Sequence, residues 1–234
     1  MTNTRTPILA LSIALSLAGC GGGSDPAPGC TPRAVTVGLY GDSTQDGATR
    51  DTPSSDPYRV VDNPAAVIQR AMDARFGAGA VVVTAKAIWG TTLDQLLAGN
   101  EGSLWGTYGA AWPAGASEDI ALENFGVNDA RLGVTPAAFG AELRAMNAAR
   151  AVVMETPLPT SAGDGLAQTV RDTAAALGAP LIDVNAYANA LPNYFGFVPD
   201  GIHPNDAGYV AITNGVVVPA LAAMVAPLRC EKTP

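Results

Sequence analysis

The sequence is poor in the residues that bind metals and nucleic acids. It has one histidine and three cysteines, and no two cysteines are spaced as Cys-x-x-Cys, so the ligand sets of structural zinc sites are missing. Its 13 basic residues form no run, and 21 acidic residues bring the formal net charge to −8. Such a chain is a poor partner for nucleic acid or for an anionic membrane surface. We therefore expect no metal and no nucleic acid partner.

What the sequence does contain is enough apolar material for a globular core. Of its 234 residues, 48% are hydrophobic and 15% are charged. These values are typical of one folded domain and not of a disordered chain. We find no internal repeat, and we expect a monomer.

The first residues resemble an export signal. Arg5 precedes an apolar stretch, Ile8–Leu17, that is too short to span a bilayer but has the length of a signal-peptide core. It runs into Leu17–Cys20 (LAGC), which resembles the lipobox of bacterial lipoproteins. The resemblance implies cleavage before Cys20 and lipidation of its sulfur. Gly21 stands where an inner-membrane retention signal has Asp, so the resemblance favours the outer membrane of a Gram-negative bacterium. An ordinary signal peptide with a chance cysteine is the alternative.

This interpretation divides the chain into four segments. The glycine-rich stretch GGGSDPAPG after the lipobox is typical of a flexible tether. We expect a lipoprotein signal peptide at 1–19, a flexible tether at 20–31, one folded domain at 32–230 and a C-terminal tail at 231–234.

Two cysteines remain near the ends of that domain. Cys30 and Cys230 form an even pair in an exported protein, which predicts a disulfide. Closing a loop of this length would stabilise the fold by about 4–5 kcal/mol in the chain-entropy model. Two free thiols are the alternative.

Strand and helix patterns alternate along the domain. Apolar and β-branched runs predict strands at Ala34–Tyr40, Ala80–Ile88, Ile120–Phe125, Ala151–Glu155 and Leu181–Val184. Caps and apolar residues at helical spacing predict helices at 63–77, 91–97, 135–146 and 166–178, and from 205 onward, where Pro219 leaves the later part open. The turn-rich stretches Gln45–Val61 and Glu101–Gly115 predict loops.

Strands that alternate with helices at this spacing predict an open parallel α/β sheet of about five strands in three layers. In such sheets the active site lies at the carboxyl ends of the strands. Four motifs follow predicted strands or lie in the last long loop: Gly41–Ser43, Gly90, Gly126–Asp129 and Asp200–His203. Their meeting at one sheet edge is what a catalytic site requires.

Each motif also has a purely structural interpretation. Ser43 is either a nucleophile or a turn or cap residue, because the Gly-x-Ser-x-Gly elbow is absent and no histidine precedes it. Gly90 is either a plain turn or a point where the backbone approaches the substrate closely, and Asn128 either shapes a turn or donates to an oxyanion. His203, three residues after Asp200, either caps its loop or serves as the base, since histidine titrates near neutral pH.

Taken together and in order, the four motifs resemble those of the SGNH (GDSL-type) hydrolase superfamily, over the domain from about Ala34 to Leu221. The matching positions are the nucleophile Ser43, the second-block glycine Gly90, the asparagine Asn128 of Gly-x-Asn-Asp, and Asp200 and His203 of Asp-x-x-His-Pro. One departure is visible. The second block often has an asparagine several residues before its glycine, and here that stretch is Ala85–Trp89 (AKAIW).

The resemblance implies a flavodoxin-like, three-layer α/β/α fold and an acyl-transfer mechanism. His203 would take the proton of Ser43, and Asp200 would orient the imidazole. The backbone N–H groups of Ser43 and Gly90 and the amide of Asn128 would hold the oxyanion. No metal or organic cofactor is needed. The remaining aspartates of the motifs, Asp42 and Asp129, are expected to brace their turns.

The resemblance fixes the substrate less well than the reaction, because family members cleave acetylated polysaccharides, lysophospholipids, thioesters and simple esters. We expect the loops Gln45–Val61 and Glu101–Gly115 to decide. The second contains Trp105, Tyr108 and Trp112, which suit stacking on a sugar ring or an apolar acyl wall.

We predict a carboxylesterase for small acyl or acetyl groups. A lysophospholipase or thioesterase of the same fold is the alternative, and a non-catalytic envelope-binding lipoprotein is a third possibility. The expected partners are a small-molecule, glycan or lipid ester and, through Cys20, the membrane.

Overall fold

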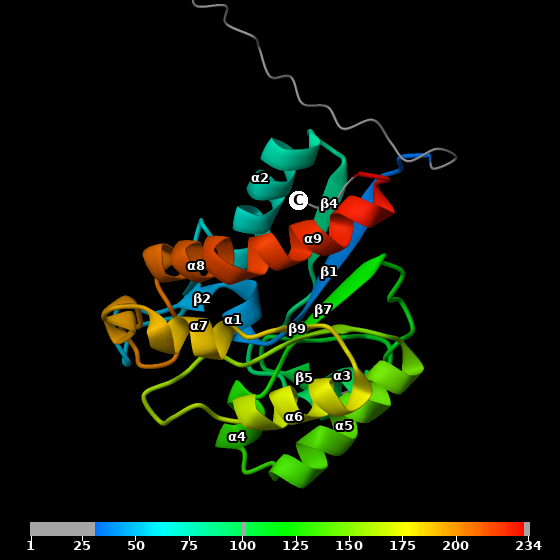
Figure 1. The fold of residues 1–234 in the computed structure, drawn as a ribbon. Helices are drawn as coiled ribbons and strands as arrows, with labels where there is room; N and C mark the ends of the chain where they lie inside the picture. Colours follow the sequence, from blue (N-terminus) through cyan, green and yellow to red (C-terminus); the bar gives the residue numbers. More distant parts are fainter. Residues whose placement is uncertain (1–30, 100–101, 232–234) are drawn as a thin grey trace, which may run out of the picture.

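A computed structural model describes residues 31–99 and 102–231 (Figure 1). Its centre is a sheet of five parallel strands in the order β4-β1-β7-β8-β9. The strands are β1 Val35–Gly41, β4 Val81–Ala85, β7 Ile120–Asn124, β8 Val153–Glu155 and β9 Leu181–Ile182. The predicted three-layer parallel α/β fold is confirmed.

The strand order places a reversal point beside β1. The chain moves from β1 to β4 on one side and then returns to build β7, β8 and β9 on the other. Leu39 pairs with Ala85 of β4 and with Leu122 of β7, so β1 is central. At such a reversal the helices that follow neighbouring strands leave to opposite faces, which opens a crevice at their carboxyl ends. The segments after β1 and β7 are the ones that carry Ser43 and Asn128.

One face of the sheet is covered by helices from both ends of the domain (Figure 1). These are α2 Pro64–Phe76, α7 Val184–Ala190, α8 Asp206–Ile212, the π-helical turn η2 Thr213–Val217 and α9 Val218–Leu228. Alternate residues of β1 (Val35, Val37 and Leu39) are fully buried against this layer. Burial of each such side chain stabilises the fold by about 1.5–3 kcal/mol.

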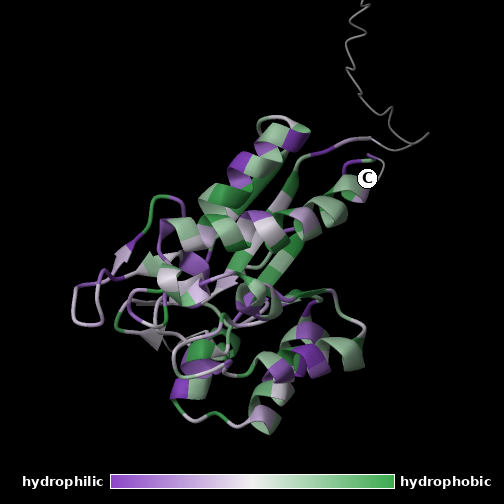
Figure 2. Ribbon diagram, turned by 60° about the vertical axis from the view of Figure 1, so that its left-hand side comes forward, coloured by the Kyte–Doolittle hydropathy of each residue, from purple (hydrophilic) through white to green (hydrophobic). Residues whose placement is uncertain are grey.

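The other face is covered by α3 Leu93–Ala98, α5 Pro136–Ala149 and α6 Ala167–Leu177. Tyr40 of β1 and Phe125, just after β7, pack there with Leu143 and Val170. In Figure 2 the long strands and α9 have largely apolar colours, whereas α5 and α6 carry hydrophilic residues between apolar ones. The α5–α6 layer is thus amphipathic, with its apolar residues on the sheet.

The short elements lie in the connections. They are α1 Ser43–Asp46, α4 Val127–Arg131, the 3₁₀ helix η1 Tyr194–Phe197, and the antiparallel pairs β2 Ala48–Thr49 with β3 Tyr58–Arg59 and β5 Gly102–Ser103 with β6 Gly106–Thr107. The sequence patterns had predicted only loops over 45–61 and 101–115, because two-residue strands have no periodicity.

Most predicted helix ends agree with the structure because they rest on caps. Asn63 accepts a hydrogen bond from Ala66 N at the start of α2, and Thr135 accepts one from Ala138 N at the start of α5. Four predicted strands are shorter than expected. The second ends at Ala85 and the third at Asn124, the fourth begins only at Val153, and Val184 belongs to α7 instead of β9. Asp183 caps α7 and ends the strand there.

The stretch after residue 205, left open at Pro219, is helical throughout its length. Asp206–Leu228 has the length and apolar composition of a membrane span, but it packs on the sheet with Leu221 and Val225 fully buried, as a core helix does. The π turn η2 ends two residues before Pro219, whose ring would clash with a carbonyl one turn earlier in a regular α-helix. The wider turn lets the helix continue past the proline.

Candidate active site

Ser43 is the first residue of a one-turn helix directly after the central strand. Asp42 caps this helix and accepts hydrogen bonds from both Thr44 N and Thr44 Oγ1 at 2.8 Å. A Cβ on Gly41 would lie 2.4 Å from the carbonyl oxygen of Asn124, so only glycine allows β1 to approach β7 this closely. The strand, the cap and the close approach together fix the position of Ser43.

The structure brings three of the predicted residues into one chain of hydrogen bonds. Ser43 Oγ lies 2.8 Å from His203 Nε2, although 160 residues separate the two. His203 Nδ1 lies 2.7 Å from Asp200 Oδ2. The other carboxylate oxygen, Asp200 Oδ1, accepts the backbone N–H groups of Ile202 at 2.9 Å and His203 at 2.7 Å. The backbone of the loop thus fixes the orientation of the Asp200 carboxylate, and the carboxylate fixes the orientation of the His203 ring.

The electrostatics of this chain favour a neutral ring beside an ionised acid. Burial lowers the pKa of His203 below its ordinary value, even though Asp200 opposes this effect. Burial raises the pKa of Asp200, but the hydrogen bonds from the His203 ring and from the two backbone N–H groups outweigh it and leave that pKa below its ordinary value. The Nδ1 proton therefore lies toward Asp200, and Nε2 is free to accept a proton from Ser43.

Three possible donors surround Ser43 Oγ. Ser43 N is at the first position of α1, where the helix leaves N–H groups without partners. Gly90 has a φ of +72°, which other L-residues rarely adopt, and it lines the cleft together with Ser43 and Asn128. Between 31 and 99 and from 102 to 231, neither Ser43 N nor Gly90 N donates a recorded hydrogen bond.

The third donor, Asn128, is already engaged. Its amide nitrogen donates to Asp42 Oδ2 at 3.2 Å and to Thr91 O at 3.0 Å. Burial raises the pKa of Asp42 to about 6 against the opposing effect of the Thr44 hydrogen bonds, so this carboxyl is mostly ionised at neutral pH. Asn128 thereby links the first motif to the second.

The expected bracing roles of the two remaining aspartates agree with their contacts. Asp129 Oδ1 accepts Leu93 N and Asp129 Oδ2 accepts Gly126 N, each at 3.0 Å. Asp42 has the corresponding role at Thr44. Neither carboxyl bonds to His203 in the described part of the chain.

The second block departs from the family pattern, and other contacts brace it. Ile88 N donates to Gly41 O at 3.0 Å, and Thr91 Oγ1 donates to Ile88 O at 2.7 Å. Ser103 Oγ, from the β5–β6 pair, donates to Trp89 O. The loop that contains Gly90 is therefore hydrogen-bonded both to the end of β1 and to the β5–β6 hairpin.

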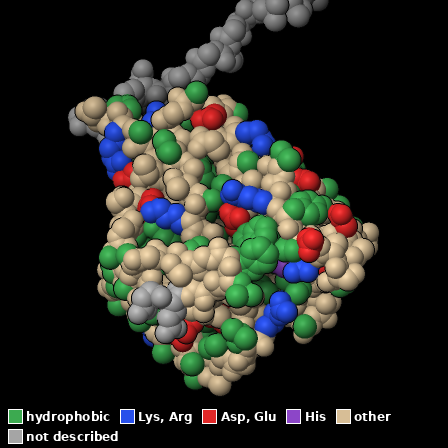
Figure 3. Space-filling view, turned by 180° about the vertical axis from the view of Figure 1, so that it is seen from behind, with side chains coloured by type: hydrophobic (Ala, Val, Ile, Leu, Met, Phe, Trp, Pro, Cys, Tyr) green, Lys and Arg blue, Asp and Glu red, His purple; other side chains and the backbone are tan. Residues whose placement is uncertain are grey.

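The cleft at Ser43 has a volume of about 150 Å³, which is small for a ligand site. Both predicted loops contribute to it. Its lining consists of Ser43, Ala48, Arg50, Pro57, Trp89, Gly90, Trp105, Asn128, Arg131 and His203. A wider hollow of about 440 Å³ shares Pro57, Trp89 and Trp105 with it. Figure 3 shows the single histidine at the surface, beside apolar and basic side chains.

The aromatic residues of the second loop are not all at the site. Trp105 is, and it packs against Trp89 with ring centroids 5.1 Å apart. Trp112 is buried instead, stacks edge-on against Tyr40 and donates to Met146 O at 2.9 Å. Tyr108 points its hydroxyl to Gly41 O at 2.7 Å. Tyr108 and Trp112 therefore do not line the cleft at Ser43. They line a separate hollow of about 290 Å³ next to α3.

Sequence reasoning also missed residues that line the cleft. Arg50 lies in a loop and Arg131 in a short helix, and neither segment shows a hydrophobic periodicity. Trp89 was named only as part of Ala85–Trp89, the stretch that differs from the family's second motif. The strand-end position of Trp89, directly before Gly90, was the available signal. Nothing in the sequence marks the two arginines.

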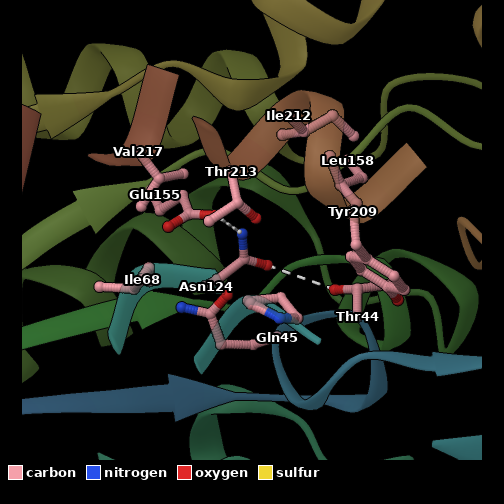
Figure 4. A pocket seen from close by; sticks show the side chains of 11 residues that line it. Thr44, Gln45, Ile68, Asn124, Glu155, Leu158, Tyr209, Ile212, Thr213 and Val217 are labelled. Atoms are coloured by element: carbon pink, nitrogen blue, oxygen red, sulfur yellow. Dashed lines mark hydrogen bonds between the residues drawn. The ribbon is translucent and has the colours of Figure 1, made fainter. Parts of the chain in front are cut away.

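A cavity of about 20 Å³, with both polar and apolar lining residues, lies next to Thr44 (Figure 4). At its wall Asn124 Nδ2 donates to Glu155 Oε1 at 2.8 Å, and Asn124 Oδ1 accepts a long bond from Thr44 Oγ1 at 3.4 Å. Burial raises the pKa of Glu155 to about 8. This cavity is separate from the cleft because the two share no lining residue. Thr44 lines the cavity, and its neighbour in the chain, Ser43, lines the cleft.

Among the described residues, no three His, Cys, Asp or Glu side chains lie close enough together to hold a metal ion. The predicted lipidation site Cys20 and one predicted disulfide partner, Cys30, lie outside those residues. Cys230 is buried at the end of α9.

The chain resembles known proteins in sequence and in fold. The model of the GDSL-like Lipase/Acylhydrolase family matches residues 39–211. A search of curated proteins gave no match.

Similar solved structures include a carbohydrate acetylesterase from Sinorhizobium meliloti, with TM-score 0.63 and 14% identity over 81% of this chain and 99% of that chain. An aryl esterase from M. smegmatis has TM-score 0.60 and 15% identity over 78% and 96%. An acetylxylan esterase from Geobacillus stearothermophilus has TM-score 0.58 and 16% identity over 87% and 99%. At these identities the likeness concerns the fold.

Proposed function

Because the chain belongs to the GDSL-like lipase/acylhydrolase family, whose members hydrolyse esters, we propose that it is a serine carboxylesterase that removes small acyl groups through an acyl-enzyme. The observation that carries the proposal is the hydrogen-bonded chain from Ser43 through His203 to Asp200, at 2.8 and 2.7 Å. A lone serine in a turn would not need this arrangement.

In the first step, His203 Nε2 accepts the proton of Ser43 as the serine oxygen attacks the ester carbonyl. Asp200 stabilises the positive ring that results. The intermediate then collapses, the bond to the alcohol breaks, and the alcohol leaves with the proton from His203. Water then attacks the acyl-enzyme and gives a proton to His203. The bond between Ser43 Oγ and the acyl group breaks, Ser43 takes the proton back from His203, and the acid is released.

The oxyanion would be held by Ser43 N, Gly90 N and the amide of Asn128. Ser43 N and Gly90 N are already available. Asn128 would exchange its longer bond, to Asp42 at 3.2 Å, for one to the substrate oxygen. Bonds of this kind often tighten only when substrate is bound. Each donor of such a hole contributes about 2.7–4 kcal/mol to lowering the barrier.

The shape of the site supports a small acyl group. A volume of about 150 Å³ at Ser43 accommodates few methylenes, and the wider hollow beyond Trp89 and Trp105 is placed for a larger alcohol part. Each buried methylene would add about 0.8 kcal/mol to binding, so a small cleft gains little from long chains. Aromatic side chains at such a rim suit an aryl or sugar ring. The structural relatives include a carbohydrate acetylesterase and an acetylxylan esterase, which supports a small acyl group.

The test is hydrolysis of 4-nitrophenyl esters from acetyl to decanoyl by residues 21–234, which retain Cys30 and Cys230, beside release of acetate from acetylated glycans. We expect kcat/KM to be highest for acetyl to butyryl, and Ser43→Ala to abolish turnover while the Tm changes little. Normal turnover in Ser43→Ala, with contaminating esterase excluded, would contradict the nucleophile. A kcat/KM that rises steadily through decanoyl would favour the lysophospholipase or thioesterase alternative.

We also propose that the enzyme is anchored to the cell envelope through a lipid on Cys20, with a disulfide between Cys30 and Cys230. The lipobox-like sequence supports the anchor. Arg229 Nη1 donates to Arg33 O at 2.8 Å, so the two ends of the domain are adjacent, which supports the disulfide. Membrane fractionation of Cys20→Ser and mass spectrometry of non-reduced peptides test the two proposals.

A further inference from the structure

Two arginines at the cleft have no ionic partner. In the described part of the chain, Arg50, Arg75, Arg131 and Arg144 form no ion pair with an Asp or Glu, whereas the other basic side chains do. Arg50 and Arg131 are the members of this set that line the cleft at Ser43. Their convergence on one small site is notable in a chain with a net charge of −8.

The cleft contains no charge that would balance them. None of its ten lining residues is an Asp or Glu. Asp46, which lines the neighbouring hollow, is already paired with Arg59 at 3.0 Å and accepts Trp89 Nε1 at 2.8 Å. Asp200 lies behind the ring of His203 and is engaged there. Arg50 and Arg131 therefore line the cleft without an Asp or Glu among the other lining residues.

The two side chains are held differently. Arg50 is half-buried, and its Nη1 donates to Ser55 O at 2.9 Å, which fixes the guanidinium at the rim. Arg131 is exposed, lies three residues after Asn128 on α4 and makes no recorded bond to the described residues. Positions three apart share one face of a helix, so Arg131 is on the side of α4 that presents Asn128. One arginine is preorganised, and the other is free to move onto a ligand.

Their charge acts on the catalytic base. Burial is the main cause of the lowered pKa of His203, and Arg50 and Arg131 both lower it further. With a neutral substrate, the two arginines thus oppose the positive charge that forms on the ring during attack. A negative charge on the substrate would cancel this opposition and would also form charge-assisted hydrogen bonds with the guanidinium groups.

We propose that the cleft selects esters that carry a carboxylate or phosphate group close to the scissile bond, with Arg50 and Arg131 as the specificity-determining residues. This inference rests on the proposed esterase function and narrows its substrate class. Trp89 and Trp105 contact the ring or chain that joins the anionic group to the ester, and the guanidinium groups bind the anion.

The test compares esters matched in shape but not in charge. The alcohol side is probed with 4-acetoxybenzoate, 4-acetoxyphenyl phosphate and the neutral methyl 4-acetoxybenzoate. The acyl side is probed with monoethyl succinate and neutral ethyl butyrate. We expect the anionic member of at least one pair to have the higher kcat/KM by about 10- to 100-fold, the range of a charge-assisted hydrogen bond. The two phenyl anions show whether carboxylate or phosphate fits better.

Variants separate the charge from the fold. Arg50→Gln and Arg131→Gln should each reduce the anionic-to-neutral ratio about 3- to 10-fold, and Arg131→Lys should retain part of it because the charge stays. Arg144→Gln is the matched control, since Arg144 is also without an ion pair but lies on α5, away from the cleft. It should leave the ratio unchanged. Raising NaCl from about 20 to 500 mM should lower the wild-type ratio, because salt screens the attraction.

The outcomes distinguish the two levels of the argument. Hydrolysis of neutral esters with no preference for any anionic partner contradicts the substrate class and leaves the esterase function standing. Equal loss of the ratio in Arg144→Gln also contradicts it. Absence of hydrolysis of every ester contradicts the esterase function and, with it, this inference.

Discussion

Two buried carboxyl sites near the carboxyl edge of the sheet differ in what surrounds them. Asp200, whose side chain is only 3% exposed, receives hydrogen bonds from two backbone N–H groups and from His203. Glu155, at the end of β8, receives one from Asn124 Nδ2 at 2.8 Å, and its other oxygen has no partner among the described residues. Both side chains are largely covered, but Glu155 lies deeper in the protein and also has fewer donors.

The difference decides which group is charged. The hydrogen bonds hold the pKa of Asp200 below its ordinary value despite burial. At Glu155 burial prevails and raises the pKa to about 8. Its neighbour Glu123 has a pKa raised well above its ordinary value, first by burial and then by repulsion from Glu155, and neither of its carboxyl oxygens has a partner within 31–99 or 102–231. Asp200 remains an anion because its loop and His203 supply hydrogen-bond donors, whereas the more deeply buried Glu155 has one donor.

Glu155 is nonetheless connected to the nucleophile. Asn124 joins it to Thr44, which is next to Ser43, through bonds of 2.8 and 3.4 Å (Figure 4). From Thr44 the path continues through Asp42 to the amide of Asn128, but it does not include Ser43 Oγ, His203 or Asp200. We therefore expect Glu155 to affect stability and Asp200 to affect the reaction, and the following substitutions test that division.

Replacing the acid of the hydrogen-bonded chain should have the largest effect. Asp200→Asn keeps the shape but removes the charge that orients and stabilises the His203 ring, so kcat for 4-nitrophenyl acetate should fall about 10³- to 10⁴-fold. Glu155→Gln, the same type of change in the other carboxyl site, should alter kcat less than about threefold. Comparable losses in both variants, or a loss of less than tenfold in Asp200→Asn, would contradict the division.

The pH dependence of kcat/KM should report His203 and not Glu155. A protonated ring cannot act as a base, so activity should fall about tenfold per unit once the pH drops below the pKa of His203. Because burial lowers that pKa below 6.5, the decline should begin below pH 6.5. No second decline is expected near pH 8, where Glu155 titrates.

Asp42, with a pKa raised to about 6, titrates in the same acidic interval. The profile of Asp42→Asn is therefore the control, and the acidic decline must persist in it. A decline that disappears in Asp42→Asn would assign the acidic limb to that carboxyl, and one near pH 8 that disappears in Glu155→Gln would give Glu155 a part in the reaction.

The sequence predicted the ionised acid far better than the neutral one. Asp200 and His203 are three residues apart in one loop, so their pairing is local and visible as a motif. Ser43 is 160 residues from His203. Its place after a strand made it a candidate, since strand ends of a parallel sheet share an edge, and the family resemblance of the four motifs decided the assignment. Glu123 and Glu155 were visible as charges at the ends of apolar runs. The sequence did not show that these carboxyls have few hydrogen-bond donors, because the donors depend on which residues of neighbouring strands lie beside them.

The same reasoning explains the errors in the loops. Caps and periodicity located α2 and α5, because the signals are adjacent in the chain. Arg50, Trp105 and Trp112 lie in segments without periodicity, where the side chain direction follows from tertiary contacts alone. Trp112 was expected to contact the substrate, but it lies in the core. No role was predicted for Arg50, which lines the cleft.

The smallest expected effect is on stability, and it tests whether Glu155 is neutral in the folded protein. Its pKa is about 8 when folded, against an ordinary value of 4.5. Below about pH 4.5 the carboxyl is protonated in both states, so it causes no loss. As the pH rises from there to about 8, the unfolded chain releases the proton while the folded chain retains it, and the free energy of unfolding falls.

Glu155→Gln has no proton to lose, so the Tm of the variant minus that of the wild type should rise from pH 5 to pH 8. At pH 5 the variant should be equal or slightly less stable, because its amide leaves an N–H without an acceptor where Glu155 Oε2 has no partner among the described residues. Each kcal/mol recovered at pH 8 would raise the Tm by about 2–4 °C. Scanning calorimetry from pH 5 to 8 measures this, with Asp172→Asn, an exposed carboxyl on α6, as the control that should show no trend. A flat difference would mean that Glu155 is ionised in the folded state, and the contrast with Asp200 would then be wrong.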